Sequence, residues 1–298
     1  MKSSEHSLFD PVGDTSQSNN ILILNSVDIG NLIKAKAPNY YRYIPRFVIS
    51  LLRKIIHQDE LNDFLRLYGH LQGADFAEAM IKHLNIKVEV HGMENIPTET
   101  CRLIFASNHP LGALDGITII SILGRKYPNR FRFIVNDMLM FVPPLAPIFL
   151  PVNKHGAQSR NATSALIATM EADFAVATFP AGLCSRNTHA DVIEDLEWKK
   201  AFIAHALHYN RAIVPMHFLA QNSKLFYRVA KLRKLLRIKF NIEMILLPRE
   251  IFKSRDKKFI ITFGSPINPE ELTPAHSHKE WAAKIRERVY QLNNINLK

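Results

Sequence analysis

The chain has 298 residues, of which 47% are hydrophobic, 9% aromatic and 22% charged. This composition is typical of a globular protein and excludes wholesale disorder and a collagen-like fibre. Lys and Arg number 38 against 27 Asp and Glu, a formal net charge of +11, so an extended partner surface is expected to be anionic, either nucleic acid or phospholipid. The two cysteines, Cys101 and Cys184, are too few for a disulfide scaffold or a four-thiolate zinc site, and they suit a reducing compartment.

Residues 1–20 are polar and are interpreted as a flexible leader. They contain no apolar run of the kind that a signal peptide carries, so the protein is expected to stay in the cytoplasm. A membrane-spanning helix needs about twenty apolar residues without charge or repeated proline, and no stretch satisfies this. Segment 138–152 is apolar but contains four prolines, and segment 103–124 is interrupted by a histidine, a proline and an aspartate. Both are predicted to be interior or interfacial.

Apolar periodicity predicts two helices at 40–56 and 61–84, within an N-terminal helical region spanning residues 21–85. Beyond it, short runs rich in β-branched and aromatic residues alternate with helical patterns. Strands are predicted at 86–90, 103–107, 131–135, 174–179, 212–218 and 259–263. Helices are predicted at 116–123, 158–170, 194–209, 225–238 and 278–292. This alternation favours an α/β domain over residues 86–298, with a mixed, partly parallel sheet flanked by helices.

The segment 108–116 follows a predicted strand and precedes a predicted helix. Residues six apart on a continuous helix lie about 240° apart around its axis, so His109 and Asp115 cannot share a helical face. His109 is therefore expected before the helix, in a turn supplied by Pro110 and Gly112 that brings the imidazole back to the Asp115 carboxylate. Such a pair is a general base with the acid that orients it. The alternative is an ordinary loop in which His109 only caps neighbouring backbone.

A second segment, Phe179-Pro180-Ala181-Gly182-Leu183-Cys184-Ser185-Arg186, follows the strand predicted at 174–179, at the end where α/β sheets gather ligands. The two segments, in this order and about 70 residues apart, resemble motifs of the glycerolipid acyltransferase family, which includes lysophosphatidic acid acyltransferases. That family has Asn-His, four residues and Asp, and later Phe-Pro-Glu-Gly-Thr-Arg-Ser. Blocks at 149–154 and 213–216 are similar to two weaker family motifs, so the resemblance spans roughly residues 86–265.

The resemblance implies an acyltransferase that moves a fatty acyl chain from acyl carrier protein or coenzyme A to the hydroxyl of a lysolipid in membrane lipid biosynthesis. His109 is then the general base, oriented by Asp115. No metal or other cofactor is expected beyond the acyl-ACP or acyl-CoA co-substrate. The residues expected to contact substrate are Asn108, Gly112, Lys154, Phe179, Pro180, Gly182, Ser185 and Arg186.

The sequence departs from the family pattern in both motifs. His109 and Asp115 have five residues between them instead of four, and the segment 181–184 has Ala in place of Glu and Leu-Cys in place of Thr-Arg. In the family those polar residues are associated with the glycerol phosphate acceptor, and an arginine suits a phosphate fork to fork. Their absence suits an acceptor without a phosphomonoester, such as a lyso form of an ornithine or glycine lipid. Alternatively, Arg186 or Lys154 replaces the missing arginine.

The remaining chemistry needs oxyanion donors and an acyl slot. Backbone N–H groups around Gly112 or Gly182 are candidates for the donors. The residues that can line a slot, and that equally suit an ordinary core, are Met138, Leu139, Met140, Phe141, Leu145 and Phe149. Cys184 as a thiol nucleophile is a further alternative, although a cysteine after a strand is typically a small buried hydrophobe.

Two basic segments are expected at an anionic membrane surface. Residues 223–242 contain seven Lys or Arg and no Asp or Glu, with apolar residues at helical spacing, and segment 40–54 combines aromatic with basic residues. The protein is therefore predicted to be peripheral, at the cytoplasmic face of the inner membrane. Solvated basic faces are the alternative for each segment. A lipid or thioester hydrolase and a basic membrane- or nucleic-acid-binding protein are the alternative functions, but nucleic acid is not the expected partner because zinc-finger spacing and RRM-like aromatic motifs are missing.

Overall fold

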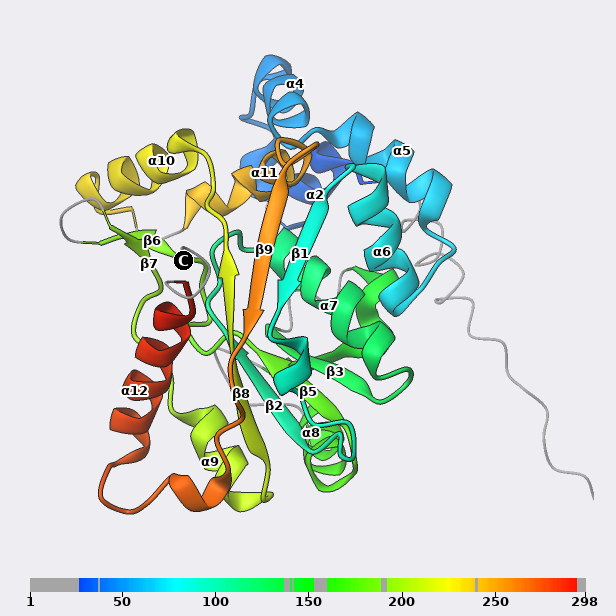
Figure 1. The fold of residues 1–298 in the computed structure, drawn as a ribbon. Helices are drawn as coiled ribbons and strands as arrows, with labels where there is room; N and C mark the ends of the chain where they lie inside the picture. Colours follow the sequence, from blue (N-terminus) through cyan, green and yellow to red (C-terminus); the bar gives the residue numbers. More distant parts are fainter. Residues whose placement is uncertain are drawn as a thin grey trace, which may run out of the picture.

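A seven-stranded sheet forms the centre of the structure, a computed structural model that describes residues 27–36, 38–136, 140, 142–152, 160–188, 192–238 and 241–293. The strand order is β1-β9-β8-β2-β5-β3-β4 (Figure 1). The strands are β1 (Lys87–His91), β2 (Leu103–Ser107), β3 (Phe131–Asn136), β4 (Phe149–Val152), β5 (Ala175–Thr178), β8 (Ala212–Leu219) and β9 (Lys258–Phe263). Neighbouring strands are parallel except β8 and β9, which are antiparallel. The predicted mixed, partly parallel sheet is confirmed.

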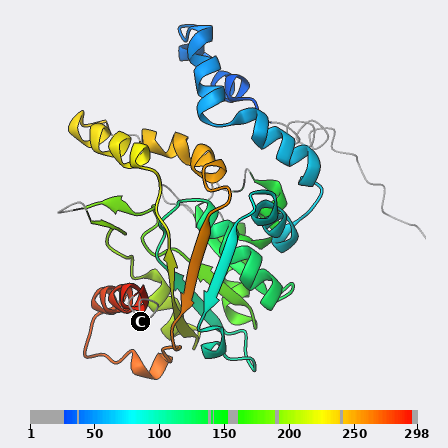
Figure 2. The ribbon, with the colours of Figure 1, turned by 45° about the horizontal axis from the view of Figure 1, so that its top comes forward.

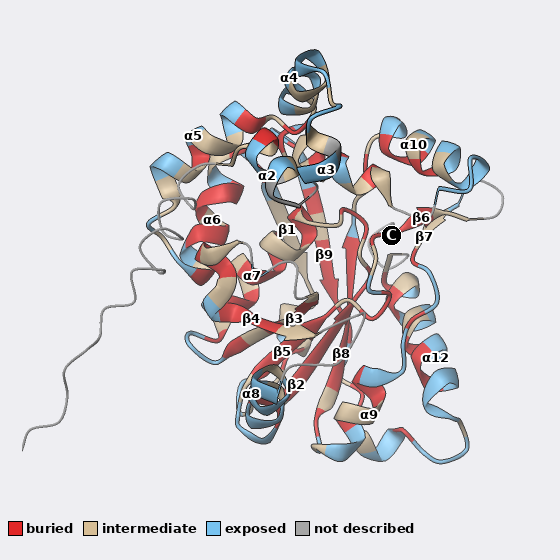
Figure 3. Ribbon diagram, turned by 180° about the vertical axis from the view of Figure 1, so that it is seen from behind, coloured by how far each residue is buried: buried red, intermediate tan, exposed pale blue. Residues whose placement is uncertain are grey.

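The central strand β2 is buried on both faces because helices cover both sides of the sheet (Figure 3). Successive side chains of a strand point to opposite faces. Leu103 and Phe105 accordingly join the larger core, to which α6 and α7 contribute, whereas Ile104 and Ala106 join a second core with α9 and α12. The flanking helices are α6 (Gly73–His83), α7 (Leu114–Lys126), α8 (Arg160–Glu171) beside β4, α9 (Ala201–His208) and α12 (His278–Gln291).

In the described part of the chain, the helices before β1 are α2 (Ile29–Lys36), α3 (Pro38–Tyr41), α4 (Arg46–Ile55), α5 (Gln58–Tyr68) and α6. The prediction of one helix over 40–56 was wrong, because Pro45 is extended and interrupts the helix between α3 and α4. The prediction of one helix over 61–84 was also wrong, because the chain turns at 69–72 and enters α6 at Gly73, whose φ of 57° favours glycine. The leader predicted at residues 1–20 lies outside the described residues.

Two further local expectations are corrected. The helix predicted at 194–209 begins only at α9, and a short antiparallel ribbon of β6 (Arg186–Asn187) and β7 (Ile193–Glu194) precedes it. The stretch between β7 and α9 is held out of the helix by tertiary hydrogen bonds of its main chain, since the Asp195 N–H donates to the Tyr290 hydroxyl at 2.8 Å and the Lys199 N–H donates to the Pro180 carbonyl at 3.0 Å. Strand β4 was not predicted, and it contains Pro151, which is tolerated because β4 is an edge strand.

The loops that carry the two motifs meet at one edge of the sheet. Strands β2, β5 and β8 are parallel, so their carboxyl ends lie together, and α10 (Lys224–Leu235) begins shortly after β8 ends. The short helices η5 (Ile242–Leu246) and α11 (Leu247–Phe252) follow, and Phe226, Tyr227 and Leu246 pack around Cys184. The other short helices in the described part of the chain are η1 (Met93–Asn95), η3 (Pro143–Ile148) and η6 (Pro269–Glu271).

Helix α4 stands out from the body of the molecule (Figure 2) and has no buried residue. Its last residue, Ile55, packs against the cluster of α10 and η5 residues around Cys184. No helix within the described ranges is long and apolar enough to cross a bilayer.

Candidate active site

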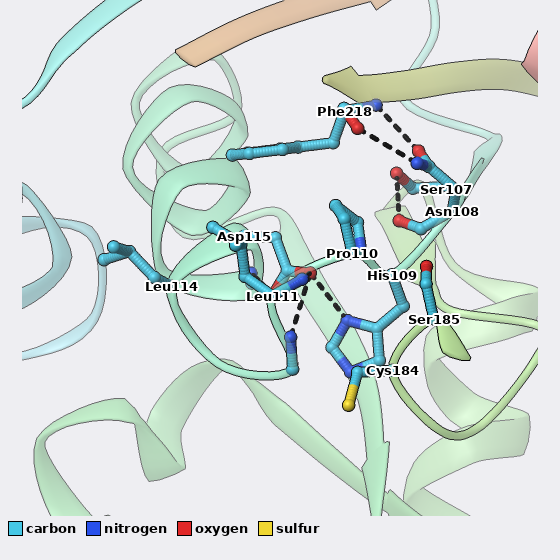
Figure 4. A network of polar contacts seen from close by, with 12 residues as sticks. Ser107, Asn108, His109, Pro110, Leu111, Leu114, Asp115, Cys184, Ser185 and Phe218 are labelled. Atoms are coloured by element: carbon cyan, nitrogen blue, oxygen red, sulfur yellow. Dashed lines mark hydrogen bonds and ion pairs between the residues drawn. The ribbon is translucent and has the colours of Figure 1, made fainter. Parts of the chain in front are cut away.

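His109 and Asp115 lie at the junction of β2 and α7. His109 follows β2 in the loop, and Asp115 occupies the first turn of α7. The expected contact is present, with His109 Nδ1 2.9 Å from Asp115 Oδ2 (Figure 4). The extra residue between them, relative to the family motif, therefore does not keep the two side chains apart.

The Asp115 carboxylate is fully buried and is held by backbone donors. Its Oδ2 accepts hydrogen bonds from the N–H groups of Leu111 at 2.8 Å and Gly112 at 3.2 Å, and its Oδ1 accepts one from Gly116 at 2.9 Å. Burial by itself raises the pKa of Asp115, but the neighbouring His109 and the hydrogen bonds outweigh burial and hold the pKa below its usual range. An ionised Asp115 accepts the Nδ1 proton of His109, which leaves Nε2 as the ring nitrogen with a free lone pair.

Gly112 lets the loop close over this carboxylate. Its φ of 82° favours glycine, and a Cβ at this position would lie 3.0 Å from Leu247 and 3.1 Å from the Cys184 sulfur. The Gly112 N–H is bonded to Asp115, and the Gly182 N–H donates to the Phe179 carbonyl at 2.9 Å. Of the N–H groups around Gly112 and Gly182 that are candidates for binding an oxyanion, those of the two glycines themselves are thus already engaged.

The imidazole of His109 is packed against the second motif. Its side chain is 14% exposed and stacks on Phe179, with ring centroids 3.8 Å apart and planes 19° apart. Phe179 in turn contacts Phe133 of β3, with centroids 5.1 Å apart. The stacking joins the two segments that the sequence separates by about 70 residues.

Asn108, expected to contact substrate, instead binds backbone. Its Nδ2 donates to the Phe218 carbonyl at 2.9 Å, and its Oδ1 accepts from the Phe218 N–H at 2.7 Å. The side chain is 3% exposed. Asn108 therefore ties the end of β2 to β8, which holds the His109 loop at the sheet edge.

The second motif forms a tight turn that is bonded to the first. Gly182 has a φ of 66° in the turn after Phe179 and Pro180. The Ser185 N–H donates to the His109 carbonyl at 2.7 Å, and the Ser185 hydroxyl donates to Asp195 Oδ1 at 2.6 Å. The structure thus brings Phe179 and Ser185 into contact with the His109 loop, as the adjacency of parallel strands allows.

Arg186 does not present a free fork to a phosphate. Its side chain is 3% exposed, and Nη2 donates to Glu243 Oε1 at 3.0 Å. Nη1 donates to the Cys184 carbonyl at 3.0 Å and lies 2.7 Å from its sulfur. The guanidinium is thus committed to the protein interior, where Glu243 also pairs with Arg233 of α10 at 3.0 Å. Lys154, the other residue named for this role, lies outside the described residues.

Cys184 is unsuited to act as a nucleophile. Its side chain is fully buried, and burial raises the pKa of the Cys184 thiol to about 11, although Arg186 opposes this. Of the residues named for an acyl slot, Leu145 and Phe149 are buried in the larger core and Met140 is 37% exposed. Met138, Leu139 and Phe141 lie outside the described residues.

Two residues near the site escaped the sequence analysis. Asp195 is buried and bonded to both motif loops, and the exposed Lys199 has its N–H bonded to the Pro180 carbonyl at 3.0 Å. The Lys199 ammonium would lie 4.0 Å from a Cβ on Gly182. Both belong to a stretch rich in acidic and basic residues, 194–200, in which no spacing distinguishes a buried charge from a solvated one.

The fold and the joined motifs define an α/β protein with a buried His–Asp pair at the carboxyl edge of its sheet. The family model described as "Acyltransferase" matches residues 31–297, and the chain belongs to this acyltransferase family. Two curated relatives, the lyso-glycine lipid O-acyltransferases of Bacteroides thetaiotaomicron and Phocaeicola vulgatus, are each 44% identical to it over 266 residues. The alignments cover 89% of this chain and 97% and 95% of the two relatives. The resemblance to acyltransferases drawn from the motifs is confirmed.

Among solved structures, the crystal structure of the 1-acyl-sn-glycerophosphate (LPA) acyltransferase PlsC from Thermotoga maritima aligns with a TM-score of 0.45 at 15% identity. That alignment covers 93% of this chain and 97% of the other.

Proposed function

We propose that this protein is a lysolipid O-acyltransferase that transfers a fatty acyl chain from acyl carrier protein or coenzyme A to the free hydroxyl of a lyso-glycine lipid. The observation that carries the proposal is the hydrogen bond between the buried Asp115 carboxylate and His109 Nδ1. It lies at the carboxyl ends of the parallel strands, where both motifs meet. The names of the two relatives support the acceptor. The altered second motif supports it as well, because no arginine fork is free there for a phosphate.

His109 acts as the general base in this proposal. Nε2 takes the proton of the acceptor hydroxyl while its oxygen attacks the thioester carbonyl, and the tetrahedral intermediate then expels the thiolate. The imidazolium returns its proton to the leaving sulfur, so the histidine is regenerated. Asp115 stabilises the imidazolium and holds the ring orientation throughout. No covalent enzyme intermediate is required, which agrees with the neutral, buried state of Cys184.

The proposed acceptor, a lyso-glycine lipid, carries the carboxylate of its glycine head group, and Lys199 is placed to bind this carboxylate. Its ammonium is beside the turn that begins at Phe179, whose ring stacks on the base. Within the described ranges Lys199 makes no salt bridge with an acidic residue, so its charge is available to a ligand. An ammonium binds a carboxylate as a point charge and does not need the fork geometry that favours arginine for phosphate.

A membrane surface over the site supplies the lysolipid acceptor in this proposal. Helix α4 and the residues before it expose Tyr43, Phe47 and Leu51, and α10 and its C-terminal end expose Leu232, Leu235 and Leu236. Lys and Arg residues accompany these side chains on both elements. Since α10 packs against the buried Cys184 of the second motif, apolar contact with a bilayer brings the site close to its lipid substrate. The predicted location at the cytoplasmic face of the inner membrane follows from this surface together with a cytoplasmic acyl donor.

The test is acyl transfer by the purified protein on vesicles that contain anionic lipid. Labelled acyl carrier protein or coenzyme A thioester is the donor, and lyso-glycine lipid and lysophosphatidic acid are offered in parallel. We expect a labelled diacylated product from lyso-glycine lipid, and none from a folded His109→Ala variant. Release of free fatty acid without acceptor would indicate a hydrolase, and vesicle binding without any reaction would indicate a binding protein. Either outcome would reject the proposal.

A further inference from the structure

Asp195 is a second buried carboxylate at the active site. Its side chain is 2% exposed and accepts three hydrogen bonds. Oδ1 accepts the His109 backbone N–H at 3.1 Å and the Ser185 hydroxyl at 2.6 Å, and Oδ2 accepts the indole N–H of Trp198 at 2.9 Å. Burial raises the pKa of the Asp195 carboxyl, whereas the three donors and the neighbouring His109 oppose this rise and favour the ionised form.

The main chain of Asp195 is anchored to the C-terminal helix α12. Its N–H donates to the Tyr290 hydroxyl at 2.8 Å, and its carbonyl accepts from Arg286 Nη2 at 2.7 Å. Asp195 also borders a cavity of about 680 Å³ between α12, the β6–β7 ribbon and α10. The charged residues that line this cavity with Asp195 are Glu194, Glu197, Lys234, Lys279, Glu280 and Arg286. His109 and Tyr290 are the other titratable residues beside Asp195.

These bonds complete a closed network around the base. The His109 N–H is held by Asp195, its carbonyl is held by the Ser185 N–H, and its ring is held by Asp115. Ser185 is bonded to Asp195 through its own hydroxyl. The position of His109 therefore depends on the carboxylate of Asp195, which lies between β7 and α9, outside both motifs, and whose main chain is anchored to α12.

We propose that Asp195 is a positioning residue for acyl transfer: its carboxylate holds the His109 main chain and the Ser185 hydroxyl, and its negative charge favours the imidazolium formed during the reaction. The proposal rests on the proposed role of His109 as general base. It extends that role, because Asp195 supplies a second source of orientation and charge from outside the two family motifs. A misplacement of the base by about 1 Å is enough to lower turnover roughly a hundredfold.

The experiment compares Asp195→Asn with Asp173→Asn in the full chain. Asp173 lies just before β5, at the opposite end of the strands from the site, and it is 47% exposed and pairs with Arg130 at 2.9 Å. Its substitution by Asn changes the net charge by the same amount as Asp195→Asn, but far from His109. The imidazole of His109 is titrated by NMR in protein with labelled histidine, and its signal is assigned by its loss in His109→Gln. Turnover and the KM for lyso-glycine lipid are measured on the same samples.

Loss of a nearby negative charge disfavours the imidazolium, so the His109 titration midpoint should fall in Asp195→Asn by about half a pH unit or more. We expect kcat to fall roughly tenfold or more, with KM within about twofold of wild type, because the loss affects the base and not acceptor binding. Asp173→Asn should match the wild type in both measurements. An unchanged midpoint in Asp195→Asn would overturn the proposal, even if turnover fell.

The role of Asp195 can still be tested if the wild type is inactive or if Asp195→Asn does not fold. If the wild type transfers no acyl group, the proposed function fails, but the midpoint still decides whether Asp195 acts on His109. If Asp195→Asn does not fold, Ser185→Ala tests the same network with the charge retained. Its kcat should fall severalfold with an unchanged midpoint, and wild-type turnover in that variant would contradict the proposed network.

Discussion

Replacing Asp115 by asparagine separates the charge of this carboxylate from its size. The carboxylate accepts four hydrogen bonds, three on Oδ2 from His109 Nδ1, Leu111 and Gly112, and one on Oδ1 from Gly116. An asparagine amide has one oxygen, so its NH₂ group must face either the three donors or the Gly116 N–H. In the less disruptive orientation the amide oxygen keeps its place beside His109. The amide NH₂ group then faces the Gly116 N–H, so that two donors meet and the Gly116 N–H loses its acceptor.

The expected loss has two parts. A hydrogen bond to a charged group contributes about 1.5–3 kcal/mol, and in the transition state of Asp115→Asn the His109 imidazolium donates to a neutral amide oxygen instead of a carboxylate. This corresponds to roughly a 10- to 100-fold fall in kcat, which is less than the complete loss of transfer expected for His109→Ala. The unsatisfied Gly116 N–H costs a further ~1–3 kcal/mol of stability, a fall in Tm of several degrees for a chain of this size.

The assay measures kcat for transfer to lyso-glycine lipid and the free energy of unfolding of each variant against pH. The pKa of Asp115 is lowered in the folded state, so its ionisation stabilises the fold at pH values above the ordinary pKa of an aspartate. This stabilisation is lost as the pH falls through the lowered pKa. The stability difference between wild type and Asp115→Asn should therefore be constant above about pH 5 and shrink below about pH 4. A kcat within twofold of wild type, or a difference independent of pH down to about pH 3, would refute the reasoning.

Three other predictions follow from the site and the surface. Arg186→Met leaves the Glu243 carboxylate buried with one fewer partner and should lower the free energy of unfolding by about 3–5 kcal/mol, measured by urea denaturation; a loss below about 1 kcal/mol would contradict the geometry. Lys199→Gln should raise the KM for lyso-glycine lipid roughly tenfold without raising it for the methyl ester of that lipid, whereas Lys200→Gln, at a neighbour that is also exposed, should change neither. Equal effects on acid and ester would reject Lys199 as the carboxylate partner. Phe47→Glu, at a side chain that is 72% exposed on α4, should weaken binding to anionic vesicles about tenfold or more in a sedimentation assay while leaving Tm within about 2 °C, and undiminished binding would exclude α4 from the membrane surface.

Several features of the sheet were predictable because they depend on local pattern. The run Leu103 to Ser107 is continuously apolar until its last residue, and it became the fully buried central strand β2. The strand at 212–218 and the helix at 278–292 were placed within about one residue of their observed ends. Helix boundaries failed where a single residue interrupts the pattern, as at Pro45, or where a tertiary contact overrides it, as where the Asp195 N–H bonds to the Tyr290 hydroxyl before α9.

The sequence by itself predicted the contact between His109 and Asp115, since six residues of separation with an intervening Pro and Gly allow the imidazole to reach back to the carboxylate, and the structure contains this contact. It also determined the acyltransferase resemblance, which resides in two short segments. The tertiary structure alone decided which charges near those segments are free: Arg186 is paired with Glu243 in the interior, whereas Asp195 holds the base from a distant part of the chain. The physical reason is that a charge's role depends on its burial and its partners, and both are set by contacts between residues that lie far apart in sequence.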